Sequence, residues 1–147
     1  MQDSVARRVE ELFVLGYRCA ESALLIVAEE KGVQSAWIPK IASGFCGGTS
    51  RTRGTCGAVA GAVMAVNLFC GRSDPSVPLY QSYPPVQRLI RAFEERFGST
   101  NCYDLTRCDL ATAEGQKKFL EENLLERCKA FTAFAAAAAL ATIDEKQ

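Results

Sequence analysis

The sequence predicts an all-α protein, and three observations support that prediction. Apolar residues recur at the three- and four-residue spacing of helices in nearly every segment, no stretch alternates like a strand, and no linker is long enough to separate domains. A chain of 147 residues also suits one domain. We therefore expect a single compact bundle of about five to seven helices over residues 1–147, with a glycine-rich loop before the central helix.

Glycine and proline residues indicate where the helices begin and end. Gly16, Gly32 and Gly98 stand where helices commonly end in a left-handed residue. Pro84 and Pro85 fit a helix only in its first turn, where the missing N–H of proline costs nothing. The expected helices are, in chain order, residues 4–15, about 19–31, a short helix after Ser35, 55–70, 84–97, a short helix from Thr112, and 124–143.

Two segments between these helices are predicted to be loops. Residues 43–55 are rich in Gly, Ser, Thr and Arg, which indicates an irregular segment before the central helix. Residues 99–111 follow a helix end at Gly98 and predict a loop with one short turn. The alanine-rich middle of residues 124–143, by contrast, strongly favours helix.

The charge balance and the absence of histidine exclude several classes of protein. With 17 basic and 17 acidic residues the net charge is zero, whereas a nucleic-acid-binding protein normally carries a basic excess. Without histidine there is no Ser-His-Asp or Cys-His relay, no His-ligated zinc and no His-ligated haem. The seven cysteines are therefore the one unusual chemical resource of the chain.

The remaining composition predicts a cytoplasmic protein with reduced thiols. Residues 1–8 mix charges and are followed by no apolar signal core, so we expect no export peptide. The most apolar stretches, 55–70 and 130–143, are shorter than a membrane span requires. An odd number of cysteines fits poorly with a closed disulfide framework, and no CxxC motif occurs. The cysteines are better interpreted as packed thiols, reactive thiols or metal ligands.

Cys56 is the cysteine whose position most favours a thiolate. It lies at the start of the central helix, where unpaired N–H groups and the positive end of the helix dipole stabilise negative charge. Arg51 and Arg53 lie just before it, and no acidic residue occurs over residues 31–73. The segment would suit thiolates or a negatively charged cluster. The absence of acidic residues also has a simpler explanation, because buried helices and glycine loops exclude carboxylates in any case.

Two other cysteines share such positions. Cys19 lies at the start of the second helix and Cys102 in the loop leading into a short turn, whereas Cys128 lies early in the last helix. Helix beginnings supply backbone N–H groups that can donate to sulfur. The shared position makes Cys19 and Cys102, together with Cys56, candidates for chemistry.

The other cysteines have less defined roles. Cys56 and Cys70 are 14 residues apart in one helix, which separates them by about 21 Å and excludes a shared metal ion. Cys70 is therefore expected to be a core thiol, and Cys108 fits either class. Cys46 lies in the loop before the central helix and could approach Cys56.

A ridge of small residues also marks the central helix. Gly57, Gly61 and Ala65 are four residues apart and share one helix face. Such a ridge lets another backbone approach closely. It predicts tight helix packing in the core or at a homodimer interface.

Several segments resemble one protein family over nearly the whole chain. They are GYRCAESA at 16–23, GFCGG at 44–48, CGAVAGA at 56–62, FGSTNCYDL at 97–105 and CKAF at 128–131. Together they are similar to the redox-active family named for its C_GCAxxG_C_C cysteine pattern. The resemblance implies that the functional set is Cys19, Cys56, Cys102 and Cys128. Cys46 falls where that family is mostly glycine, and is therefore an extra thiol.

These observations leave several functions open. The first hypothesis is an electron-transfer protein whose four cysteines bind an iron–sulfur cluster, with Arg51, Arg53 and Gly57 as supporting residues and an unidentified redox partner protein. The second is a thiol–disulfide redox protein or enzyme, with Cys56 as the low-pKa catalytic thiolate and Cys19, Cys46 or Cys102 as its resolving partner. The others are a structural zinc site made by the same four cysteines, and a helical interaction domain with no cofactor.

Overall fold

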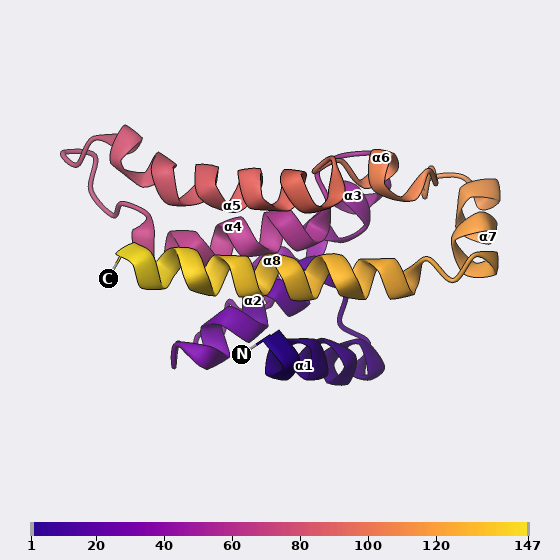
Figure 1. Ribbon diagram of the computed structural model, residues 1–147, viewed down its shortest axis with the longest axis horizontal. Coiled ribbons are helices and arrows are strands. Elements are labelled where there is room, and N and C mark those ends of the chain that lie inside the picture. The colour runs from indigo at the N-terminus through magenta and orange to yellow at the C-terminus, as the bar shows by residue number, and fades with distance from the viewer. Residues whose placement is uncertain (1, 147) are drawn as a thin grey trace.

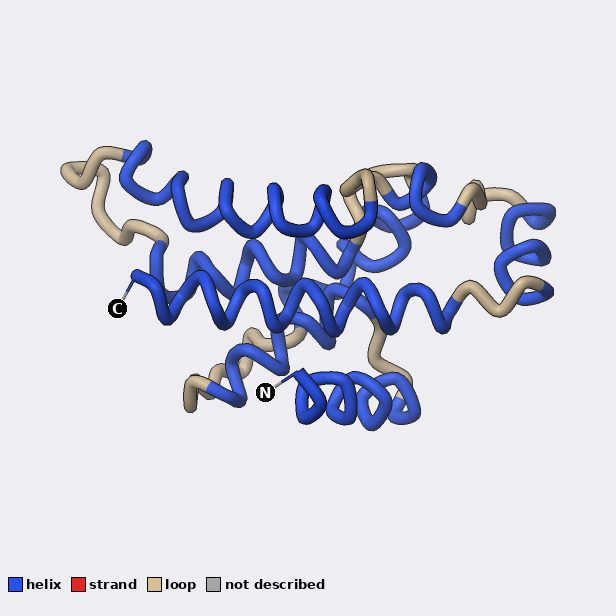
Figure 2. The backbone as a smooth tube through the Cα atoms, in the orientation of Figure 1, coloured by secondary structure: helices blue, strands red, loops and turns tan. Residues whose placement is uncertain are grey.

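The apolar segments form helices throughout the computed structural model, which describes residues 2–146 (Figures 1 and 2). Eight α-helices and no strand occur among these residues, so the predicted all-α class is confirmed. The number of helices is larger than the expected five to seven. The reason is that two segments expected to be loops contain the short helices α3 and α6. The helices are α1 (Gln2–Leu15), α2 (Cys19–Glu30), α3 (Cys46–Arg51), α4 (Gly57–Cys70), α5 (Tyr83–Phe97), α6 (Cys102–Thr106), α7 (Ala113–Glu121) and α8 (Leu125–Lys146), with 3₁₀ helices η1 (Lys40–Phe45) and η2 (Leu79–Ser82).

The long helices α4, α5 and α8 lie side by side along the longest axis of the molecule, and α1 and α2 cover the other side of α8 (Figure 1). The small-residue ridge of α4 packs inside this core. A Cβ added to Gly61 would lie 2.3 Å from the carbonyl oxygen of Ala20 in α2, so only glycine allows the two helices to come this close. The ridge is therefore used within the chain, and its role as a homodimer interface gains no support.

Four phenylalanines fix α5 against the first half of α8. Phe93 and Phe97 come from α5, and Phe131 and Phe134 come from α8. The rings of Phe97 and Phe131 meet edge to face with centroids 4.9 Å apart, a favourable arrangement for aromatic pairs. This contact holds the start of α8 beside the end of α5, where α3, α6 and α7 also gather (Figure 1).

Residues 43–55 differ from the irregular loop that their composition predicts. The short helix expected after Ser35 is the 3₁₀ helix η1, and α3 follows it as a left-handed turn with positive φ at five consecutive residues, 47–51. A left-handed conformation costs a residue with a Cβ about 1–2 kcal/mol. Hydrogen bonds offset that cost: the Ser50 hydroxyl donates to the Gly44 carbonyl at 2.7 Å, and the Gly54 N–H donates to the Gly48 carbonyl at 2.8 Å.

None of the helices between Gln2 and Lys146 combines the length and apolarity needed to cross a membrane.

Candidate functional site

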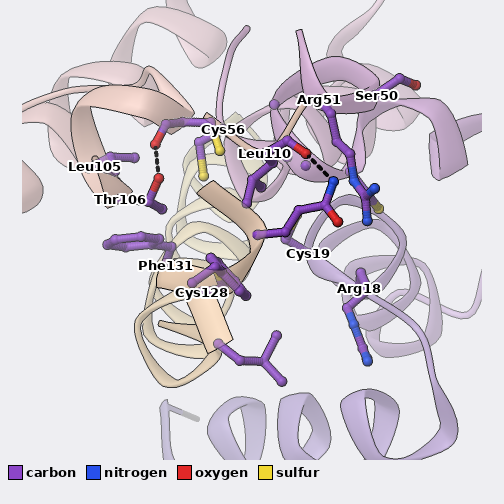
Figure 3. Close-up of a pocket in the computed structure, with 18 of the residues that line it drawn as sticks. Arg18, Cys19, Ser50, Arg51, Cys56, Leu105, Thr106, Leu110, Cys128 and Phe131 are labelled. Carbon is purple, nitrogen blue, oxygen red and sulfur yellow. Dashed lines mark hydrogen bonds between the residues drawn. The ribbon is translucent and has the colours of Figure 1, made fainter. Parts of the chain in front are cut away.

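Five of the seven cysteines line one cavity of about 670 Å³ at the end of the molecule where the short helices gather (Figures 1 and 3). No carboxylate occurs among the described residues that line it, whereas two arginines do. Four of these cysteines, Cys19, Cys46, Cys102 and Cys128, lie in α2, α3, α6 and α8, and the fifth, Cys56, directly precedes α4. The four cysteines selected from the sequence thus lie around one space, together with Cys46.

Cys70 and Cys108 lie outside the cavity lining. Cys70 is buried at the opposite end of α4 from Cys56, as its position in the helix predicts. Cys108 is also buried, and its thiol donates to the Thr106 carbonyl at 3.5 Å. Both are satisfied by their own surroundings.

A short backbone ladder brings Cys56 and Cys102 to the cavity together. Thr55 and Asn101 form an isolated antiparallel bridge. On either side of it, the Cys56 N–H donates to the Thr100 carbonyl at 2.7 Å and the Cys102 N–H donates to the Gly54 carbonyl at 3.0 Å. The two cysteines are 46 positions apart in the sequence, and this ladder explains why they meet.

Two glycines make room for sulfur. A Cβ on Gly57 would lie 2.3 Å from the Cys19 sulfur, and a Cβ on Gly48 would lie 2.6 Å from the Cys102 Cβ. Either addition would push a cysteine from its place. Gly57, singled out in the sequence as a supporting residue, therefore supports the site by leaving space for the Cys19 thiol.

The arginines divide into two groups. Arg51 lines the cavity, whereas Arg53 stacks on the Tyr103 ring, with its guanidinium carbon 3.7 Å from the ring centroid, and is not part of the lining. Arg18, which sequence reasoning missed, lines the cavity as well. Figure 3 shows Arg18 and Arg51 on one side of the cavity and Phe131 and Cys128 on the other. The position of Arg18 directly before Cys19 was the signal that could have found it.

The sulfurs on the side formed by α4 and α8 are held as neutral thiols. Burial raises the pKa of Cys56 to about 11, although the backbone N–H groups of Ala58 and Val59 donate to its sulfur. Burial, together with the nearby Cys56 and Cys102, raises the pKa of Cys128 to about 12. The prediction of a low-pKa thiolate at Cys56 is therefore wrong. The N–H donors at the helix start are present, but loss of solvent outweighs them.

Cys46 has the opposite electrostatic environment. The hydrogen bond it shares with the Cys19 thiol, helped by the backbone N–H groups of Glu21 and Ala20, lowers the pKa of Cys46 to about 7. That same hydrogen bond and burial raise the pKa of Cys19 well above its ordinary value. The Cys46 thiol also donates to the Glu21 carboxylate at 3.9 Å. The same contact therefore lowers the pKa of Cys46 and raises the pKa of Cys19.

Among residues 2–146, no three cysteine, aspartate or glutamate side chains converge as a single metal ion requires. The four thiols instead surround a cavity large enough for a group bigger than one atom.

Comparison with known proteins agrees with the cysteine pattern. The family model described as "Putative redox-active protein (C_GCAxxG_C_C)" matches residues 17–142. The chain belongs to this C_GCAxxG_C_C family. In this C_GCAxxG_C_C protein, Cys19, Cys56, Cys102 and Cys128 lie around one cavity of an all-α fold.

One curated relative of this C_GCAxxG_C_C protein comes from Archaeoglobus fulgidus. It is 32% identical over 130 residues, which cover 81% of this chain and 85% of the relative, and it is described as "Uncharacterized protein". No solved structure matches the chain. The cysteine site is therefore the feature of the molecule that bears most directly on its function.

Proposed function

We propose that this C_GCAxxG_C_C protein is an electron-transfer protein that binds an iron–sulfur cluster through Cys19, Cys56, Cys102 and Cys128. The observation that supports this proposal is the convergence of these four thiols on one cavity, from α2, α6, α8 and the residue that precedes α4. Four cysteine thiolates are the usual ligands of iron–sulfur clusters. Neither histidine nor a carboxylate occurs among the described residues of the lining, so thiolates are the ligands on offer.

The spacing of the thiols favours a cluster over a zinc ion. Zinc would draw four sulfurs to about 2.3 Å from one point. No three potential ligands among the described residues approach that arrangement. A cluster presents several iron atoms and accepts sulfurs that are further apart, which agrees better with a cavity of about 670 Å³.

The surrounding residues also suit a negatively charged group. The backbone N–H groups of Ala58 and Val59 donate to the Cys56 sulfur. The backbone N–H group of Gly47 donates to the Cys19 sulfur. Arg18 and Arg51 line the cavity, and their positive charges would offset negative charge there. When bound, the cluster would accept and release single electrons. Binding would displace the thiol protons of the four cysteines, because metal ligands must be thiolates.

Metal analysis of anaerobically purified protein tests the proposal. We expect iron and inorganic sulfide, with the visible absorption of a cluster, and loss of both when Cys56 or Cys128 is replaced by serine. Cys70→Ser is the matched control, because it also changes a buried thiol of α4 but lies away from the cavity. One zinc per chain, or equal iron in Cys56→Ser and Cys70→Ser proteins of native helix content, would contradict the proposal.

Burial weighs against the thiol–disulfide hypothesis centred on Cys56. A thiol buried to 5% exposure, with its pKa raised to about 11, is almost fully protonated at neutral pH and is a poor attacking group.

A further inference from the structure

The thiols account for only part of the cavity lining. Helix α7 and the turn after it contribute Gln116, Phe119, Leu120 and Asn123, and none of these residues is a cysteine. The whole cavity, at about 670 Å³, has the size of pockets that hold small organic ligands. The side formed by α7 therefore offers space that the four proposed cluster ligands do not occupy.

Helix α7 borders this space because it stands apart from the bundle. It lies across the end of the molecule, beyond the end of α5 and the start of α8 (Figure 1). Within α7, all of whose residues the structure describes, only Gly115 is buried. Leu120 lines the cavity and is nevertheless 77% exposed, which places it at the opening, and the neighbouring Phe119 is half-buried. Two large apolar side chains thus border open space.

Polar contacts with the preceding loop hold α7 in this position. The Thr112 hydroxyl accepts the Gly115 N–H at 2.9 Å, and the Gln116 side chain donates to the Leu110 carbonyl at 2.9 Å. The position of α7 therefore does not depend on burying Phe119 and Leu120, and these side chains stay available to a ligand.

Two arginines of the lining have no acidic partner. Among the described residues, neither Arg18 nor Arg51 forms an ion pair. The Arg18 guanidinium donates to the backbone carbonyls of Phe13 and Tyr17 at 3.1 and 2.9 Å, which fixes its position. Arg51 is brought to the cavity by the left-handed turn of α3, in which its own φ is 64°. The fold thus places two unneutralised cations at one cavity.

We infer that the cavity binds a small organic anion with an apolar body. Its anionic group bonds to Arg18 and Arg51, because guanidinium groups match the paired oxygens of a carboxylate or phosphate. Its body covers Phe119 and Leu120. Figure 3 shows the two arginines on one side of the cavity and apolar side chains, Phe131 among them, on the other. Apolar walls with a few polar groups are typical of ligand pockets.

This site goes beyond the proposed cluster and does not require it. The four residues assigned to the ligand, Arg18, Arg51, Phe119 and Leu120, include no cysteine. Each guanidinium carries five N–H donors, so it can hold an anion while its charge also offsets that of a cluster.

Titration calorimetry of the full-length, anaerobically purified protein with 2-naphthoate tests the inference. We expect one saturable site per chain. The neutral 2-naphthamide lacks the charge, and inorganic phosphate lacks the apolar body, so each should bind at least about tenfold more weakly. If either probe binds as tightly as 2-naphthoate, or if 2-naphthoate shows no saturable binding, the inference is wrong.

Two exposed positions allow matched variants. Arg51→Gln should weaken 2-naphthoate binding about tenfold. Arg53→Gln is its control, because Arg53 stacks on Tyr103 outside the lining, and should leave binding unchanged. Leu120→Ser should weaken binding about fivefold through lost apolar contact. Its control is Leu15→Ser, because Leu15 is a leucine of α1 that is 70% exposed and not part of the lining.

Equal binding by a variant and its control would overturn the corresponding contact. Sedimentation of the same proteins tests whether a second copy covers α7 instead. A dimer that dissociates in Leu120→Ser and persists in Leu15→Ser would contradict the ligand site. Iron and sulfide are measured on the titrated samples. Naphthoate binding without iron contradicts only the proposed cluster, and iron without naphthoate binding contradicts only the ligand site.

Discussion

The two sides of the cavity place the same residue type in opposite environments. On the α2 side, Cys46 receives backbone N–H groups from the start of α2 and has a lowered pKa. On the α4–α8 side, Cys56 also receives two backbone N–H groups at the start of a helix, yet its pKa is raised. Cys46 is partly exposed and shares a hydrogen bond with Cys19, whereas Cys56 is buried without such a partner. Donors at a helix start therefore stabilise a thiolate only where burial does not outweigh them.

Alkylation of the metal-free, reduced protein is the sharpest way to test this contrast. At pH 7 we expect iodoacetamide to modify Cys46 roughly 100-fold faster than Cys56. Their pKa values of about 7 and about 11 give Cys46 far more thiolate, and its weaker intrinsic nucleophilicity removes part of that advantage. Timed quenching and peptide mass spectrometry measure both rates in one sample.

The pH dependence of the same reaction should differ between the sides. Only the thiolate reacts, so the Cys46 rate should fall as the pH drops below about 7 and level off above it, while the Cys56 rate should keep rising toward pH 11. The ionisable groups around Cys46 are Cys19 and Glu21, with Arg18 and Arg51 in the same cavity lining. Equal rates for Cys46 and Cys56 at pH 7 would show that burial does not separate the two sides.

Filling the space beside Cys19 should cost stability. In Gly57→Ala the added methyl would lie 2.3 Å from the Cys19 sulfur and 2.9 Å from the Phe45 carbonyl oxygen. We expect the free energy of unfolding to fall by about 2–3 kcal/mol, the range for overpacking a close contact. Denaturation in urea, followed by circular dichroism, measures this change.

Gly44→Ala is the matched control for that substitution. Its added methyl would meet only the Ser50 hydroxyl oxygen at 3.6 Å, an ordinary contact, in the same η1–α3 region. We expect a change below about 0.5 kcal/mol. A similar loss in both variants would mean that the α2 side is not closely packed around Cys19.

The sequence predicted the elements of this site better than their contacts. Apolar spacing and glycine stops locate α2, α4, α5 and α8 to within a few residues, because helix boundaries depend on local chemistry. The resemblance selected four cysteines that line one cavity. Their roles as ligands stay a prediction.

What could not be predicted from the sequence depends on α3 and on burial. Thr49, Ser50 and Arg51 have no preference for the left-handed conformation, so nothing local signals a turn that carries Cys46 to the start of α2. The position of Cys46 in the sequence allowed it to approach Cys56, and both line the cavity, but nothing in the sequence indicated its contact with Cys19. The prediction of a low pKa for Cys56 failed for a related reason. The sequence shows that Cys56 lies at a helix start, but it does not show how deeply that helix start is buried.

The smallest predicted effect concerns the charge of Glu21. Its carboxylate accepts a hydrogen bond from the Cys46 thiol, with sulfur and oxygen 3.9 Å apart, and it would repel a Cys46 thiolate. The Glu21 charge therefore raises the pKa of Cys46, whereas the hydrogen-bond donors lower it. Glu21→Gln should therefore speed alkylation of Cys46 about threefold at pH 6. Glutamine also retains the acceptor for the Arg18 N–H at the start of α2, so the helix should persist.

Glu29→Gln is the matched control, because it removes the same charge from the other end of α2, where Glu29 pairs with Arg8. It should leave the rate of Cys46 alkylation unchanged. Equal rates in the two variants would show that the N–H donors and Cys19 alone set the reactivity of the α2 side.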